Sequence, residues 1–186
     1  MIGFAMCGSY CTHAKALQQI EKLVSEGYEV LPILSENSYT TDTRFGSAEA
    51  LRDKLCKMCK REPIHSIVDA EPLGPKLALD ALILCPCTGN TLAKMAQGIT
   101  DTAVSMAAKA HLRSNRPLVI ALASNDALSA NLKNIATMLN RKHVYFVPMF
   151  QDDPEKKPHS LIADFSLLKP TLESAFKGEQ YQKIFI

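Results

Sequence analysis

The chain has 186 residues, of which 47% are hydrophobic, and its 21 basic and 19 acidic residues give a formal net charge of +2. This length buries one sizeable core and is too short for two ordinary domains with a linker, so we expect a single domain over residues 1–186. The lack of a long basic block argues against nucleic acid as a partner. No apolar run is long enough to cross a bilayer and the start lacks a secretory pattern, so we expect a cytoplasmic protein with no membrane partner.

The first elements alternate between strand and helix. Residues 2–7 are a short apolar run, residues 14–26 place apolar side chains on one helical stripe, and residues 29–34 are apolar again. Gly27 ends the helix as a C-terminal cap. This order predicts a βαβ unit, whose strands are parallel with a right-handed crossover.

A polar stretch over residues 36–43 leads to a predicted helix at 47–61 and a short strand at 66–69. The chain is then broken by Pro72, Gly74 and Pro75. A buried strand at 81–85 follows, and Pro86 turns the chain out of that strand.

The second half of the chain continues the alternation. The predicted order is helix 91–97, helix 102–113, strand 117–123, helix 128–140, strand 144–147, a charged loop at 152–158 and helix 161–176. Strand 117–123 is apolar throughout, which is typical of a strand covered on both faces. The whole pattern predicts a doubly wound, three-layer α/β sandwich with a mostly parallel sheet.

Six cysteines are present. In a reducing compartment such residues are more often buried or reactive thiols than disulfides. Cys56 and Cys59 have the C-x-x-C spacing of redox and zinc sites, but they fall in a helical pattern and have no second ligand pair at zinc-ribbon distance. We therefore expect no metal site.

Three loops follow strands of the predicted parallel sheet and should meet at one edge, where ligands bind in such folds. They are residues 8–12, 35–38 and 86–91. In the first, Gly8 permits close backbone approach, and the hydroxyls of Ser9 and Thr12 beside a helix N-terminus suit a phosphate. The alternative is ordinary helix capping by Ser9 or Thr12, which the loop alone favours because neither a G-x-G-x-x-G pattern nor a P-loop lysine is present.

The loop at 86–91 offers Asn90, whose amide donates and accepts hydrogen bonds and suits a planar heterocycle or a carboxylate. The alternative is that Thr88 or Asn90 caps the helix that begins near Thr91. A similar ambiguity, capping against ligand contact, applies to residues 124–126 after the strand at 117–123.

The run Pro86-Cys87-Thr88-Gly89-Asn90-Thr91 resembles the P-A-S-A-N-T loop of the flavin-containing cysteine decarboxylase superfamily. Residues 98–101, 116–119 and 128–134 are similar to segments of the related flavin prenyltransferases, so the resemblance covers most of the chain. It implies a Rossmann-like, flavodoxin-like fold that binds flavin mononucleotide (FMN), and homo-oligomers.

Within this superfamily, residues 8–13 and 85–94 resemble the family of dipicolinate synthase B subunits from spore-forming bacteria. This resemblance implies a cytoplasmic subunit of an oxidoreductase. Its partner would be a nicotinamide-dependent A subunit, which would carry the NAD(P) chemistry. Together they would form dipicolinic acid from a carboxylate intermediate of the lysine pathway during sporulation.

Several positions depart from the better-known family members. Met106 replaces an arginine of the prenyltransferases, Ser124-Asn125 replace an Arg-Glu pair, and Gln151 and Lys169 replace a tyrosine and an arginine. Because charge-assisted hydrogen bonds are the strong ones, these losses weaken a prenyl-phosphate site.

Cysteine decarboxylases use an upstream histidine and a P-x-M-N clamp, and the clamp pattern is absent from this sequence. His65 lies in the region of that histidine, and His13 adjoins the first loop. Cys11 and Cys87 lie near the expected ligand, but no adjacent base is evident that would activate either thiol.

We therefore predict an FMN or similar phosphorylated planar ligand at this edge. The predicted cofactor-binding residues are Gly8, Ser9, Tyr10, Thr12, Ser35, Pro86, Thr88, Asn90, Thr91 and Asn125. The first loop and Ser35 would hold the phosphate end, Thr88, Asn90 and Thr91 would face the ring or a substrate carboxylate, and Asn125 would close the site. Asn90 and His65 are the predicted catalytic residues.

Two other functions are compatible with the sequence. One is a stand-alone flavin-dependent decarboxylase that works with Asn90 and His65. The other is a non-catalytic subunit that has lost flavin binding, an interpretation that Met106 favours.

Overall fold

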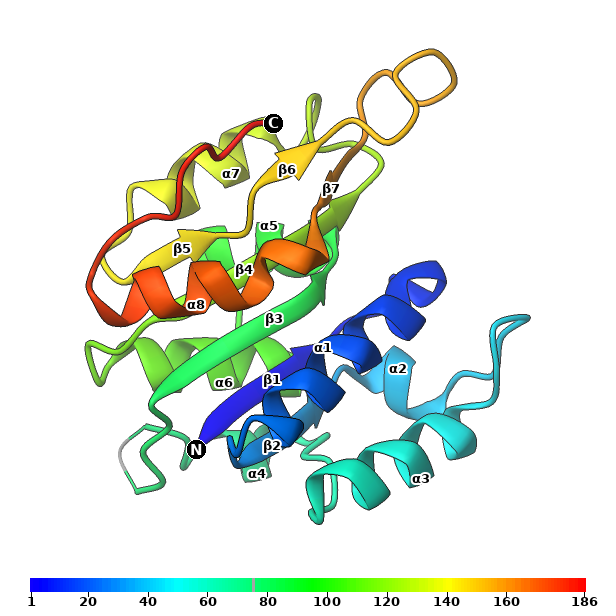
Figure 1. Cartoon of the computed structure of the whole chain (residues 1–186), viewed down its shortest axis with the longest axis vertical. Helices are drawn as coiled ribbons and strands as arrows, with labels where there is room; N and C mark the ends of the chain where they lie inside the picture. The colour runs from blue at the N-terminus through cyan, green and yellow to red at the C-terminus, as the bar shows by residue number, and fades with distance from the viewer. Residues whose placement is uncertain (75) are drawn as a thin grey trace.

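Four parallel strands form the centre of the sheet in the computed structural model, which describes residues 1–74 and 76–186 (Figure 1). Their order is β2 (Val30–Leu34), β1 (Ile2–Met6), β3 (Ala81–Cys87) and β4 (Leu118–Ser124). Every residue of β1, β2 and β3 is buried, as expected for parallel strands covered on both faces. These strands place their carboxyl ends at a common edge.

Beyond β4 the sheet divides. The first half of β4 pairs in parallel with β5 (Val144–Phe146), while its end pairs antiparallel with β7 (Leu161–Ala163). A short β6 (Met149–Phe150) pairs antiparallel with β7. The β6–β7 hairpin extends beyond the carboxyl ends of the central strands (Figure 1).

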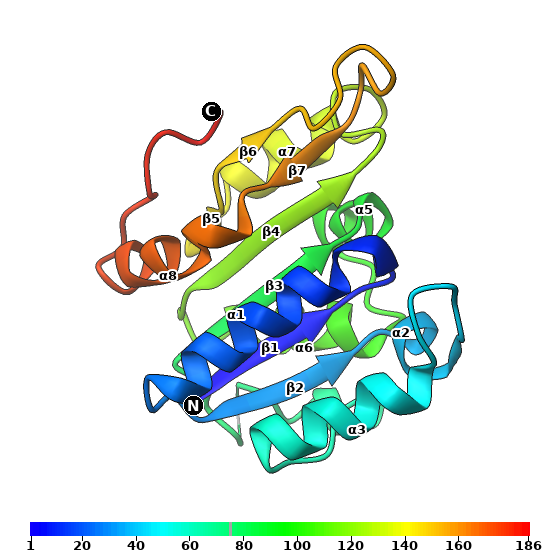
Figure 2. The same cartoon turned by 45° about the vertical axis from the view of Figure 1, so that its right-hand side comes forward.

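Helices cover both faces of the sheet (Figure 2). One face carries α1 (His13–Ser25), α3 (Ala48–Cys59) and α8 (Leu168–Phe176). The other carries α4 (Ile67–Ala70), α5 (Gly89–Gln97), α6 (Ala103–Leu112) and α7 (Leu132–Leu139). A short α2 (Glu36–Thr40) follows β2, and two 3-10 turns, η1 (Tyr10–Thr12) and η2 (Phe165–Leu167), precede α1 and α8. The predicted three-layer, flavodoxin-like α/β fold is confirmed.

The strand predicted at 66–69 is wrong. These residues begin α4, whose N-terminus is capped by Ser66: its Oγ accepts a hydrogen bond from the Asp69 backbone N–H at 3.1 Å. The extended pairing lies just before it, where Ile64 bridges to Ile33. The Ser-x-x-Asp spacing is an N-terminal signal that outweighs the β-branched pair inside the turn.

Two strand and helix boundaries also differ at the last part of the chain. The helix predicted at 161–176 is divided into β7, η2 and α8, because Asp164 accepts a hydrogen bond from the Ser166 N–H at 2.9 Å and starts a new turn. The helix predicted at 128–140 begins only at Leu132. The residues before it form turns instead.

Pro86 does not end its strand, contrary to the prediction. β3 continues to Cys87, and the pairing with β4 shifts register between Leu84 and Cys87. A proline lacks an N–H and is tolerated in a sheet at such an irregularity. The polar stretch at 36–43 likewise contains α2. Pro75, expected to break the chain, lies outside the described residues.

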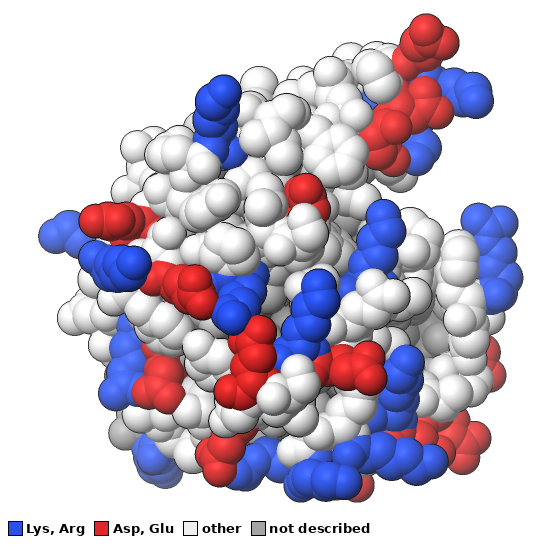
Figure 3. Space-filling model, viewed as in Figure 1, with Lys and Arg blue, Asp and Glu red and all other residues white. Residues whose placement is uncertain are grey.

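Charged side chains of both signs are interspersed over the face shown in Figure 3. No helix among the described residues is long and apolar enough to cross a membrane.

His111 is a fully buried titratable group of α6. Its Nε2 lies 2.9 Å from the Pro117 carbonyl oxygen, so this nitrogen carries the proton, while Nδ1 has no hydrogen-bond partner. Burial, chiefly, lowers the pKa of His111. The imidazole is therefore neutral in the fold.

The pKa of His111 is lower in the folded than in the unfolded chain, so protons bind preferentially to the unfolded chain. The contribution of His111 to the free energy of unfolding is therefore complete above its unfolded pKa and decreases as the pH falls below about 6.5. We expect the free energy of unfolding to decrease between pH 7.5 and 5.5 by up to about 1.4 kcal/mol per pH unit from this group. Urea denaturation of His111→Gln should show a shallower pH dependence than the wild type. The exposed His159→Gln is the control, and equal slopes for His111→Gln and wild type would contradict the assignment.

Candidate functional site

Backbone and side-chain hydrogen bonds join the three loops at the carboxyl edge of the sheet. The Cys7 N–H donates to the Pro86 carbonyl at 3.1 Å, which links the first and third loops. The Ser35 N–H donates to the Met6 carbonyl at 3.0 Å, and the Tyr10 hydroxyl donates to the Asn37 carbonyl at 3.1 Å. The predicted convergence of these loops is therefore present in the structure.

A hydrogen bond between two of its own residues stabilises the first loop. The Thr12 hydroxyl donates to the Ser9 carbonyl at 2.8 Å, and neither Ser9 nor Thr12 makes a side-chain capping bond to the helix that follows it. Helix capping, the alternative role considered for these two hydroxyls, is wrong. Thr12 is buried, whereas Ser9 is half-buried and reaches the surface of the loop.

His13 stands at the start of α1 with a defined proton position. Its Nε2 lies 2.8 Å from the Cys7 carbonyl oxygen, so Nε2 carries the hydrogen and Nδ1 is left as an acceptor. Burial lowers the pKa of His13, although the bond to Cys7 opposes this shift. The ring packs against Tyr10 at a centroid distance of 5.3 Å. The neutral His13 imidazole thus contacts both Cys7 and Tyr10 and stabilises the first loop.

Thr88 caps α5 as the alternative interpretation predicted. Its Oγ1 accepts a hydrogen bond from the Thr91 N–H at 3.3 Å and lies 3.2 Å from the Thr91 hydroxyl. Asn90 is in the first turn of this helix and is exposed. The two roles considered for this loop are therefore divided between its residues: Thr88 shapes the helix start, and the Asn90 amide faces outward.

A polar network after β4 supports the start of α5. The Asp126 carboxylate accepts hydrogen bonds from the Ser124 hydroxyl and, at 2.9 Å, from the Asn131 amide. The Asn134 amide donates to Asn131 at 2.8 Å. The bond from Ser124 is the main cause that lowers the pKa of Asp126, with Asn131 contributing, so Asp126 is ionised.

Gly89 lies directly on this network. A Cβ at Gly89 would overlap Ser124 Oγ and lie 2.6 Å from Asn131 Nδ2 and 2.9 Å from Asp126 Oδ1. This explains a glycine where the P-A-S-A-N-T motif has alanine. It also places a carboxylate at the N-terminus of α5, where the helix dipole favours negative charge. An anionic ligand group therefore gains less at α5 than at the first loop, since the first turn of α1 contains no acidic residue.

Exposure separates the predicted cofactor-binding residues into two groups. Those with exposed or half-exposed side chains or backbone are Gly8, Ser9, Tyr10, Ser35, Thr88, Asn90 and Asn125. Those that are buried are Thr12, Pro86 and Thr91. The first group can contact a ligand directly, whereas the second supports the loops from below.

His65 lies at the outer side of this edge, next to β2. It directly follows Ile64, which pairs with Ile33. Its ring is exposed and stacks on Tyr39 of α2, with a centroid distance of 3.8 Å and an interplanar angle of 5°. The Arg52 guanidinium also lies over the Tyr39 ring, 4.7 Å from its centroid. The structure thus associates His65 with α2 and α3, and its catalytic role stays a prediction.

Three thiols are buried beneath the edge. Burial raises the pKa of Cys7, Cys85 and Cys87, and hydrogen bonds from Thr91 and the Thr88 backbone only partly offset this for Cys7. These groups are neutral thiols at neutral pH and not nucleophiles.

The C-x-x-C pair is equally unsuited to thiolate chemistry, because burial raises the pKa of Cys56 and raises that of Cys59 to about 11. Within the described residues no group of three or more histidine, cysteine or acidic side chains could hold a metal ion.

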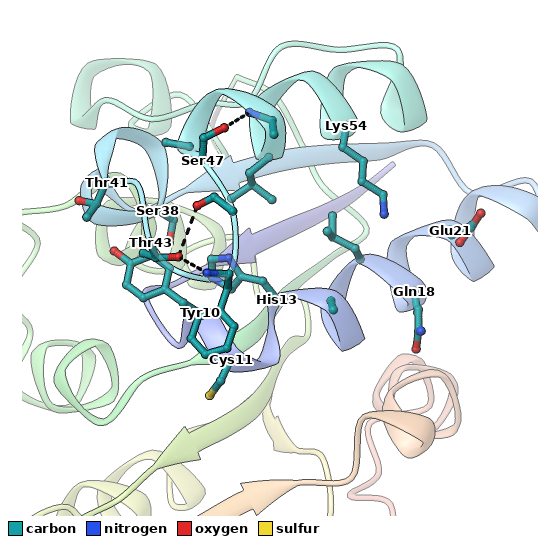
Figure 4. A pocket seen from close by; sticks show the side chains of 17 residues that line it. Tyr10, Cys11, His13, Gln18, Glu21, Ser38, Thr41, Thr43, Ser47 and Lys54 are labelled. Carbon is teal, nitrogen blue, oxygen red and sulfur yellow. Dashed lines mark hydrogen bonds between the residues drawn. The ribbon is translucent and has the colours of Figure 1, made fainter.

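A cavity of about 510 Å³ adjoins the first two loops, between α1 and α3 (Figure 4). Tyr10, Ser38 and Thr43 lie at one end, and Glu21 and Lys54 lie at the other. Its described lining includes no residue of the loop at 86–91. This cavity was not predicted from the sequence, because its walls come from segments far apart in the chain. The hydroxyl-rich stretch at 40–47 is the sequence signal that points to it.

The hairpin between β6 and β7 is a second feature of this edge that the sequence does not predict. Its loop is closed by a hydrogen bond from the Gln151 amide to the Pro158 carbonyl at 2.9 Å and by a Lys157–Asp152 ion pair at 2.8 Å. The loop stands beyond the carboxyl ends of the strands (Figures 1 and 2). Lys169 lies in α8, outside this loop, and forms an ion pair with Glu26 at 2.8 Å.

The model of the flavoprotein family matches residues 1–165. The chain belongs to the flavoprotein family. It is 45% identical over 185 residues to the B subunit of dipicolinate synthase from Bacillus subtilis (strain 168), an alignment that covers 100% of this chain and 92% of that protein.

Two solved structures are similar to this flavoprotein-family chain. The crystal structure of the dipicolinate synthase B subunit from Bacillus halodurans C superposes with a TM-score of 0.91 at 41% identity, covering 100% of this chain and 95% of the other. The FMN-dependent cysteine decarboxylase SpaF superposes with a TM-score of 0.69 at 21% identity, covering 94% and 95%. The second likeness is one of fold.

The contact of Gly89 with the Asp126 network provides a direct test. Gly89→Ala should lower the free energy of unfolding by about 1–3 kcal/mol, because the methyl group overlaps three fixed polar atoms. Gly8→Ala is the matched control: the atoms nearest to its Cβ would be those of the Tyr10 ring at 3.7 Å, an ordinary contact, so the change should stay within about 0.5 kcal/mol. Denaturant titration measures the free energy of unfolding of both variants. Equal losses in the two variants would show that the Asp126 network does not exclude a side chain at Gly89.

Proposed function

We propose that the chain binds FMN at the carboxyl edge of the sheet and acts as the B subunit of a dipicolinate synthase. The observation that carries the proposal is the group of exposed hydroxyl, amide and backbone groups on three hydrogen-bonded loops, in a chain 45% identical over its whole length to such a subunit. The FMN dependence of SpaF, a protein of the same fold, supports the choice of cofactor.

The phosphate end of FMN is assigned to the first and second loops. Gly8 and Ser9 precede η1 and α1, whose first turn carries no acidic side chain, and Ser35 caps α2 next to them. Tyr10 links the two loops through its bond to Asn37. Helix N-termini and loop N–H groups bind phosphate without a lysine. The assignment is consistent with Asp126 already occupying the N-terminus of α5.

The flavin ring is assigned to Thr88, Asn90 and Asn125. Asn90 and Asn125 are exposed at the starts of segments that follow β3 and β4, so their amides can donate to and accept from a heterocycle. Bound flavin would supply an acceptor or donor for two electrons. The chain itself would orient the ring through Asn90, while Thr12, Pro86 and Thr91 keep the loops in place.

FMN titration tests the cofactor assignment. Flavin fluorescence should be quenched by the wild type, and Asn90→Ala should weaken binding by about tenfold, the loss expected for a hydrogen bond to a buried polar ligand group. Asn140→Ala, whose amide caps the end of α7, should bind like the wild type. Lack of binding by the wild type would overturn the cofactor proposal and favour the non-catalytic subunit.

Reconstitution tests the role in the pathway. With FMN and a nicotinamide-dependent A subunit, the chain should be required for the formation of dipicolinic acid from a lysine-pathway carboxylate. We propose that the complex also contains several copies of this chain, which light scattering would measure.

The alternative of a stand-alone decarboxylase makes a different prediction. The chain with FMN alone would then release carbon dioxide from a thiol-bearing acid, and His65→Asn would abolish the reaction. Activity without the A subunit would contradict the synthase role, whereas inactivity over a panel of such acids would remove the alternative.

A further inference from the structure

A second hollow, of about 290 Å³, lies at the C-terminal end of α5, whereas the proposed flavin site lies at its N-terminal end. Its walls are the end of α5, one side of α6 and the segment after α7, and its lining includes Met95, Ile99, Leu112 and three basic residues, Lys109, Arg113 and Arg141. α5 has nine residues, so its two ends are about 13 Å apart. The volume is near the lower end of small-ligand sites, which span about 300–1,000 Å³.

The charged residues that line this hollow are all basic. None of its lining residues is acidic, and in the described part of the chain none of the three basic side chains forms an ion pair. Lys109 in the last turn of α6 and Arg113 at its C-cap are spaced i,i+4, an arrangement in which like charges repel. An anion in the hollow would relieve this repulsion.

Arg141 comes from a different segment and is already oriented. Its Nη1 donates to the Met95 carbonyl at 3.2 Å, at the end of α5. A guanidinium has five N–H donors in a rigid fork, so the remaining donors can bind a carboxylate. Arg141 stands at the C-terminus of α5 as Lys109 and Arg113 stand near that of α6, so basic groups from two helix ends converge on one hollow.

The floor of the hollow is apolar. Met95 and Ala108 are 5% and 2% exposed, while Ile99 is 46% exposed at the rim. Apolar walls with a few convergent charged groups are typical of small-molecule sites. The combination suits a ligand with a flat apolar body and carboxylates at its margin.

We propose that this hollow binds a small aromatic carboxylate, with Arg113 and Arg141 contacting the carboxylate and Met95, Ile99 and Leu112 contacting the ring. The choice of pyridine-2,6-dicarboxylate as the ligand rests on the proposed function, since it is the product of that reaction. The hollow would then let product bind to the chain without entering the flavin site.

Calorimetric titration of the flavin-free chain with pyridine-2,6-dicarboxylate tests this inference. Arg113→Gln and Arg141→Gln should each weaken binding by about fivefold, the effect of one partly exposed ion pair. Lys142→Gln removes the same charge next to Arg141 but outside the hollow, and it should bind like the wild type. The dimethyl ester, which keeps the ring and lacks the charges, should not bind to the wild type.

Three results would overturn the inference: no heat of binding for the dicarboxylate, equal affinity in the two arginine variants and wild type, or equal affinity for the ester. The ester comparison uses only wild-type protein and so holds even if a variant fails to fold. FMN is titrated into the same preparation. FMN binding without dicarboxylate binding removes this inference alone, whereas dicarboxylate binding at the hollow without FMN binding removes the proposed cofactor alone.

Discussion

The carboxyl edge of the sheet, where we propose that the flavin binds, depends on the close contact between Gly89 and the ionised Asp126 network. Because the first residue of α5 has no side chain, the helix can begin directly above Ser124 and Asn131, and this sets where Asn90 emerges. The same carboxylate occupies the positive end of the α5 dipole. One contact therefore determines both the position of the exposed Asn90 amide and the end of the edge that can accept negative charge.

The P-A-S-A-N-T-like loop contains residues with different physical tasks. Asn90 is exposed, Thr88 caps α5, and Thr91 and Pro86 are buried and bonded to the neighbouring strand loop. A sequence motif does not distinguish these tasks, since a residue that shapes a loop and one that touches a ligand are both specific to the loop. Exposure and hydrogen-bond direction separate them.

The sequence was sufficient for β1, β2 and β4, because continuous apolar runs between turn residues have few other uses in a chain of this length. It was insufficient where a short local signal competed with hydrophobicity, as at Ser66 and Asp164, which each accept a bond that begins a helical turn. The Asp126 network and the cavity between α1 and α3 could not be predicted. Both are formed by residues that only the tertiary fold brings together.

The thiols beneath the edge have a consequence for how opening of the fold could be observed. Cys11 is exposed, whereas Cys7, Cys85 and Cys87 are buried and protonated within β1, β3 and their junctions with the loops. An alkylating reagent reacts with an accessible thiolate. In the folded chain these three thiols are neither accessible nor deprotonated. Their labelling rate would therefore report separation of β1 from β3, so the chain carries an intrinsic chemical probe of the stability of the carboxyl edge of its sheet.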